Sequence, residues 1–135
     1  MTSAGTLRLI VDALDGAGIG HMLAGSFASS LHGMARTTAD IDLVIDPTPE
    51  AIDDLLRRLD NARFYVDPAR ARSALVDRDQ FNVVDLTNGW KVDLIIRKDR
   101  AFSRSEFERR EPATVLGVEA SVATAEDTVL AKLEW

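Results

Sequence analysis

The sequence predicts an α+β fold in which helices pack on a small mixed β-sheet. Three observations lead to this prediction. Apolar residues recur at helical spacing in several segments, short apolar runs resemble strands, and Gly or Pro separates one segment from the next. No linker-like Gly/Ser-rich or Pro-rich stretch divides the chain, and no internal repeat is present. Residues 1–135 are therefore expected to form a single domain.

The first half of the chain is expected to alternate helices with strands. The periodic apolar residues before Gly16 and the capping signal of Thr48, followed by Pro49, mark the two clearest helices. The expected elements are a helix at about 4–15, a strand at 19–25, a two-turn helix at 27–33, a strand at 40–46 and a helix at 48–60.

The second half is expected to contain a hairpin. Two strand-like runs flank Asn88-Gly89, which is a strong short-range hairpin signal. The other expected elements are a helix at 68–77, strands at 81–86 and 90–96, a short polar helix at 103–111, a strand or bent hairpin at 113–124 around Gly117, and a terminal helix from 125 capped by Thr124.

Composition and charge exclude several classes of function. The net charge of −6 argues against a protein that coats nucleic acid, and the absence of cysteine excludes disulfides and thiolate metal sites. No apolar run approaches the roughly 18 residues that a membrane helix needs, and the N-terminus does not resemble a signal peptide. We therefore expect a soluble cytoplasmic protein without a membrane partner.

Three aspartates are candidate metal ligands. Asp40 and Asp42 are two residues apart in an expected strand, so their side chains would project from the same face. Asp93 lies within a second strand, among aliphatic residues, where a carboxylate needs a partner. If the two strands are neighbours, the three carboxylates converge on one point. Such a cluster suits Mg²⁺ or Mn²⁺.

A structural explanation of these aspartates stays open. Asp40 and Asp42 could be solvated residues at the start of an edge strand, because the pattern Asp-x-Asp is common and weak on its own. Asp85, in the other Val-Asp-Leu sequence of the hairpin, is most simply a solvated strand end.

The turn at Gly25-Ser26 is a candidate phosphate site. It follows an expected strand and opens an expected helix, so free backbone N–H groups and the Ser26 hydroxyl would face an anion there. A routine helix start has the same appearance. A nucleoside triphosphate would explain the phosphate site and the metal site together.

These residues together resemble a known family. Gly25-Ser26, Gly33, Arg36, Thr38 and Asp40-Ile41-Asp42, followed by an aspartate in "KVDLII", resemble the polymerase β-like nucleotidyltransferase superfamily. The resemblance is strongest to its minimal members, including the AbiEii-like group of toxin–antitoxin systems. It implies the nucleotidyltransferase fold and transfer of a nucleoside monophosphate from a nucleoside triphosphate to a hydroxyl, with release of pyrophosphate.

The resemblance also implies roles for individual residues. Asp40, Asp42 and Asp93 would hold two Mg²⁺ or Mn²⁺ ions, and Asp93 would help to deprotonate the acceptor hydroxyl. Gly25 and Ser26 would bind the β- and γ-phosphates. Weaker nucleotide-binding candidates are Arg36, Thr38 and Lys132.

Several alternatives remain. The acceptor could be an RNA end, a protein or a small molecule, and a partner protein or a homodimer could complete the acceptor surface. The chain could also keep the fold without the chemistry and act as a regulatory or antitoxin-like binding subunit, although the presence of all three carboxylates argues against this.

Overall fold

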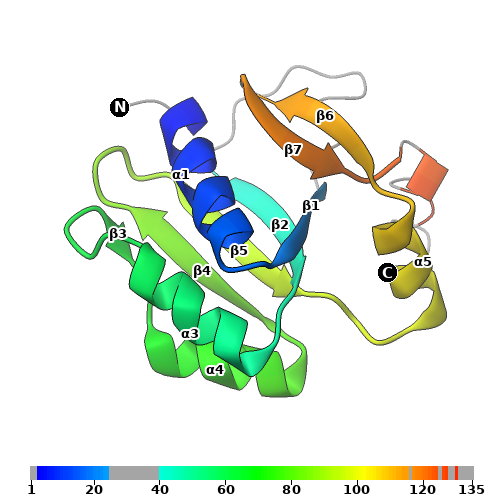
Figure 1. The fold of residues 1–135 in the computed structure, drawn as a ribbon, viewed down its shortest axis with the longest axis horizontal. Helices are drawn as coiled ribbons and strands as arrows, with labels where there is room; N and C mark the ends of the chain where they lie inside the picture. Colours follow the sequence, from blue (N-terminus) through cyan, green and yellow to red (C-terminus); the bar gives the residue numbers. More distant parts are fainter. Residues whose placement is uncertain (1–2, 25–39, 116, 125, 128–129, 131–135) are drawn as a thin grey trace.

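A seven-stranded mixed β-sheet forms the centre of the protein (Figure 1). The computed structural model describes residues 3–24, 40–115, 117–124, 126–127 and 130. The strands are β1 (Gly20–Ala24), β2 (Asp40–Asp46), β3 (Phe64–Tyr65), β4 (Gln80–Asp85), β5 (Lys91–Ile96), β6 (Glu111–Val115) and β7 (Val118–Val122). The helices are α1 (Ser3–Gly16), α3 (Pro49–Arg58), α4 (Pro68–Asp77) and α5 (Ala101–Glu108). The predicted α+β class is confirmed.

Two of the expected helices are not part of this description. The helix expected at 27–33 lies outside the described residues, and so does most of the expected terminal helix. The short strand β3 was not expected from the sequence, because two residues are too few to give a period-2 pattern.

The strand order is β3-β4-β5-β2-β1-β7-β6. Two neighbouring pairs run parallel, β2 with β5 and β1 with β7, and the other pairs are antiparallel. The central strands β2 and β5 are therefore neighbours although α3, β3, α4 and β4 separate them in the sequence. This adjacency was the condition on which the carboxylate hypothesis depended.

One face of the sheet carries the main hydrophobic core. Alternate residues of β2 and β5, such as Ile41, Leu43 and Leu94, are fully buried there. Helices α1, α3 and α4 pack on this same face and complete the core (Figure 1). The residues between the buried ones in β2 and β5 point to the opposite face, which these three helices leave uncovered.

The helices turn their apolar stripes toward the sheet. Leu7, Ile10 and Leu14 of α1 are fully buried in the core, and Ile52 and Leu55 contribute to it from α3. These are apolar positions that the helical spacing predicted, because residues three and four apart lie on one face of a helix.

Capping residues fix where two of these helices begin. The side chain of Thr48 accepts a hydrogen bond from the backbone N–H of Ala51 at the start of α3, and Asp67 caps α4 in the same way. Both helices were predicted from the sequence, and Thr48 was the expected cap of α3. Near the other end of the chain, Thr124 Oγ1 accepts a hydrogen bond from the N–H of Asp127 at 3.1 Å, which confirms Thr124 as a cap.

The two expected hairpins are present, and the turn of the first is not a two-residue turn. A two-residue type I′ turn needs a positive φ at both central residues, and only Gly89 of the Asn88-Gly89 pair has one, at 78°. The connection is instead a longer loop closed by a 2.8 Å bond from Gly89 N–H to the carbonyl of Asp85. In the second hairpin Gly117, with a φ of 76°, lies between β6 and β7.

Helix α5 covers part of the opposite face, next to β6 and β7 (Figure 1). Its Phe107 packs with Met22 of β1 and Ala123. Arg109, directly after α5, binds the Asp127 carboxylate with two hydrogen bonds of 2.9 and 2.7 Å. Within the described residues, no helix is long and apolar enough to cross a membrane.

Candidate active site

Asp42 and Asp93 are direct neighbours on adjacent strands. The parallel pairing of β2 with β5 places Asp42 opposite Asp93, and adjacent strands are about 4.8 Å apart. Both residues alternate with fully buried aliphatic residues, so both lie on the face that α1, α3 and α4 leave uncovered. Each is half-buried. Two carboxylates are therefore held side by side at a partly solvated surface.

The remaining members of the expected site are described less fully. Asp40 begins β2, and its backbone pairs with Lys91, but its side chain lies outside the described residues. The phosphate-site and nucleotide-site candidates also lie outside the described residues: Gly25, Ser26, Arg36, Thr38 and Lys132. The structure thus places Asp42 beside Asp93, and it places the backbone of Asp40 at the start of the same strand.

Two residues of this surface were missed by sequence reasoning. Lys91 lies two residues before Asp93 on β5, and therefore on the same face, in register with Asp40. Asn82 of β4 is in register with Asp93 on its other side. The alternation of β5 was sufficient to place Lys91 beside the carboxylates. Asn82 could be found only once the length of the hairpin loop was known, because the loop sets the register.

The carboxylate pair fits a hard divalent cation. Like charges at this spacing repel each other, and a bound cation offsets that repulsion. Carboxylate oxygens are also the ligands that Mg²⁺ and Mn²⁺ prefer. Among the side chains that the structure describes, no group of three or more His, Cys, Asp or Glu residues could hold a metal ion. Asp42 and Asp93 could supply two carboxylate ligands to such an ion.

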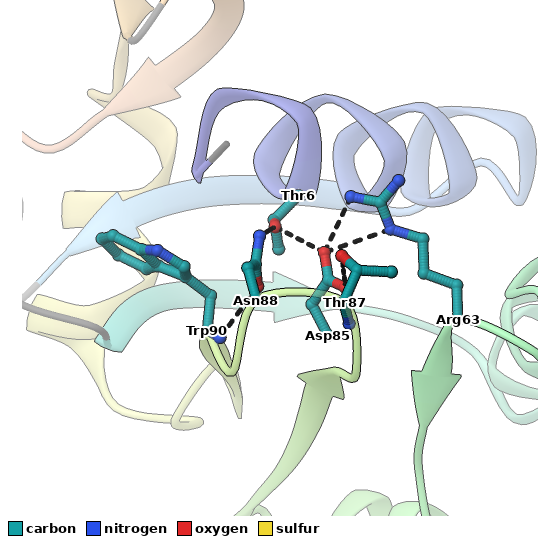
Figure 2. A network of polar contacts seen from close by, with 6 residues as sticks. All are labelled: Thr6, Arg63, Asp85, Thr87, Asn88 and Trp90. Carbon is teal, nitrogen blue, oxygen red and sulfur yellow. Dashed lines mark hydrogen bonds and ion pairs between the residues drawn. The ribbon is translucent and has the colours of Figure 1, made fainter. Parts of the chain in front are cut away.

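The expectation for Asp85 was wrong. This carboxylate is fully buried rather than solvated, and Figure 2 shows it surrounded by hydrogen-bond donors. Its Oδ2 accepts from Thr6 at 2.6 Å and from two nitrogens of Arg63 at 3.1 and 2.8 Å. Its Oδ1 accepts from the backbone N–H and hydroxyl of Thr87 at 2.9 and 2.6 Å.

This network is structural. Burial alone would raise the pKa of Asp85, but the hydrogen bonds from Arg63, Thr6 and Thr87 outweigh burial and hold the pKa of this carboxyl well below its usual range. Asn88 extends the network, because its Nδ2 donates to Thr6 at 2.9 Å (Figure 2). The network ties α1, the hairpin loop and the segment before β3 together on the face opposite Asp93. Asp85 therefore does not belong to the candidate site.

Comparison with known proteins supports the fold that the sequence resemblance implied. No protein-family model matches the chain, and no curated protein matches it in sequence. Among solved structures, a candidate nucleotidyltransferase of Thermotoga maritima is similar with a TM-score of 0.59 at 15% identity, covering 99% of this chain and 86% of that one. The lincosamide antibiotic adenylyltransferase LnuA, in a lincomycin-bound structure, is similar with a TM-score of 0.61 at 13% identity, covering 96% and 85%. The chain has the fold of nucleotidyltransferases.

Proposed function

We propose that the protein is a magnesium-dependent nucleotidyltransferase, which moves a nucleoside monophosphate from a nucleoside triphosphate to an acceptor hydroxyl. The observation that supports this most directly is the register of Asp42 with Asp93, on the face of the sheet opposite α1, α3 and α4, in a chain with the nucleotidyltransferase fold. Two carboxylates held side by side repel each other, and a bound divalent cation would offset that repulsion.

In this proposal the candidate site residues have the following tasks. Asp40, Asp42 and Asp93 hold two divalent ions, which stabilise the charge on the attacking and leaving oxygens when they are bound. Asp93 also accepts the proton of the acceptor hydroxyl. Other residues proposed to bind the nucleotide are Gly25 and Ser26 at the β- and γ-phosphates, with Arg36, Thr38 and Lys132.

The reaction is a single in-line displacement. The acceptor oxygen forms a bond to the α-phosphorus, the bond from that phosphorus to the bridging oxygen breaks, and pyrophosphate leaves. An RNA end, a protein or a small molecule could supply the hydroxyl. LnuA, which shares the fold, is named as an adenylyltransferase of lincosamide antibiotics, so the fold is compatible with a small-molecule acceptor. A partner protein, as in a toxin–antitoxin pair, or a second copy of the chain remains part of the proposal.

Calorimetric titration with each nucleoside triphosphate, with and without Mg²⁺, tests this function. We expect one triphosphate to bind in a Mg²⁺-dependent manner to the wild type and not to Asp42→Asn. Asp46→Asn is the matched control, because Asp46 lies on the same strand and face but is exposed and pairs with Arg97 at 3.5 Å. If no triphosphate binds with either Mg²⁺ or Mn²⁺, the protein is not this enzyme. Binding without transfer to any acceptor would instead identify a regulatory subunit.

A further inference from the structure

A small pocket lies at the edge of the sheet, where β3 ends and α4 begins. Its volume is about 150 Å³, below the roughly 300–1,000 Å³ of pockets that hold drug-sized ligands. It is lined by Tyr65, Asp67, Arg70, Gln80, Phe81 and Asn82. The pocket therefore has room for one small ring, or for one end of a larger molecule.

The pocket adjoins the candidate active site. Asn82 lines the pocket and is also in register with Asp93 across the β4–β5 ladder. Asp93 is in turn in register with Asp42, and Asp42 with Ala24 at the end of β1. Asn82, Asp93 and Asp42 thus form one row across three neighbouring strands, and the pocket lies at the end of the row next to Asp93.

The pocket offers neutral hydrogen-bonding groups. Within the part of the chain that the structure describes, no hydrogen bond involves the side chains of Tyr65, Gln80 or Asn82, and Tyr65 is 59% exposed. The two charged residues of the lining are already engaged. Arg70 pairs with Asp79 at 2.9 Å, and Asp67 accepts hydrogen bonds from the first backbone N–H groups of α4.

We propose that this pocket binds the acceptor, and that the acceptor is a small uncharged polyhydroxylated molecule of the sugar type. This inference rests on the function proposed above. The amides of Gln80 and Asn82 can pair with hydroxyl groups, and the Tyr65 ring offers an apolar surface on which a sugar ring can lie.

The position of the pocket implies the side from which the acceptor would approach Asp93. In the strand order β1 lies on the far side of β2 from β5, and the residues proposed to hold the β- and γ-phosphates come directly after β1 in the sequence. An in-line displacement needs the attacking oxygen opposite the leaving pyrophosphate, and an acceptor in the pocket would approach from the β4 side of Asp93. The acceptor hydroxyl would give its proton to Asp93, its oxygen would bond to the α-phosphorus, and pyrophosphate would leave on the side opposite the acceptor.

A nucleic acid acceptor fits this pocket poorly. Binding to a phosphate backbone depends on cationic side chains that are available for phosphate. Arg70, the cationic residue of the lining, is paired with Asp79, and Asp67 adds a negative charge beside it. The net charge of the chain, −6, also opposes such binding.

Ligand-observed NMR without nucleotide tests the pocket directly. The probes are neutral monosaccharides and cyclitols, with sugar phosphates as the charged comparison. We expect at least one neutral probe to bind the wild type, and Tyr65→Ala and Asn82→Ala to weaken that binding by about fivefold, the effect of one lost hydrogen bond or ring contact. Val76→Ala, at a position that is 82% exposed on α4, is the control and should bind as the wild type does. Absence of binding, or binding that neither variant weakens, would overturn the inference.

The transfer reaction separates failure of the pocket from failure of the proposed function. With triphosphate labelled at the α-phosphate, we expect label in the neutral probe, a KM for that probe raised about fivefold in Tyr65→Ala, and an unchanged nucleotide affinity. Label transferred to added RNA or protein would overturn the acceptor class while retaining the enzyme. Sugar binding without any triphosphate binding would overturn the enzyme while retaining the pocket.

Discussion

Replacing Arg63 by methionine is expected to destabilise the protein strongly, because it leaves Asp85 as a buried carboxylate without its cationic partner. Asp85 is fully buried, and Arg63 donates two of its hydrogen bonds, at 3.1 and 2.8 Å. Removing one partner of a buried ion pair costs about 3–5 kcal/mol. This agrees with the loss of two hydrogen bonds to a charged group, each worth about 1.5–3 kcal/mol. Methionine keeps most of the aliphatic stem, so the change is mainly electrostatic.

Urea unfolding measures this cost, and the chain provides a matched control. With a slope of about 2 kcal/mol/M, the midpoint of Arg63→Met should fall by roughly 2 M. Arg70→Met removes a guanidinium from a pair with Asp79 of similar length, 2.9 Å, but that pair is about half exposed and screened by solvent, so its loss should change the midpoint far less. If both variants lose the same stability, burial does not determine the strength of the Asp85 network.

Three further predictions concern pH, the site and a turn. Because the pKa of Asp85 is lowered in the folded state, the ionised carboxylate contributes its full stabilisation above the ordinary carboxyl range, and this stabilisation is lost as pH falls through and below that range. The difference in unfolding free energy between the wild type and Asp85→Asn, measured by urea unfolding at several pH values, should therefore shrink below about pH 4. Lys91→Met should lower the melting temperature of the metal-free protein by a few degrees, the effect of roughly 1 kcal/mol. Mg²⁺ should raise the melting temperature of the variant more than that of the wild type. Equal Mg²⁺ effects in a thermal melt would contradict a role of Lys91 in offsetting the repulsion between the carboxylates. Gly117→Ala should lower the free energy of unfolding by about 1–2 kcal/mol through backbone strain alone. The φ of Gly117 is +76°, and nothing lies within 4 Å of the added Cβ. An unchanged unfolding midpoint would show that the turn adapts to the substitution.

Local patterns predicted the elements well, because each depends on residues close together in the sequence. The spacing of Ile52 and Leu55 and the cap at Thr48 were sufficient for α3. The strand of Asp42 was equally clear, because buried aliphatic residues alternate with carboxylates. The pairing of β2 with β5 could be stated only as a condition, since nothing in a single sequence specifies which strands become neighbours.

The failures concern partners that are distant in the sequence. Asp85 looked solvated because it is close to a turn, but Thr6 and Arg63, which bury it, are 79 and 22 residues away. Asn82 was missed for a related reason, because its place beside Asp93 depends on the loop that joins β4 to β5. The identity of neighbours across the sheet is a property of the folded chain and is not encoded in any one segment.

The two parallel pairings also affect how the protein folds. Asp42 and Asp93 meet only when β5 docks beside β2, and β1 meets β7 only when a segment far along the chain returns to it. Forming such contacts closes long loops, and the chain loses conformational entropy before the contacts stabilise the fold. Folding is therefore slow in proteins that depend on them. The hairpin of β4 and β5 is local and can form early. We therefore expect Asp42 and Asp93 to come together late in folding, after the local hairpin has formed.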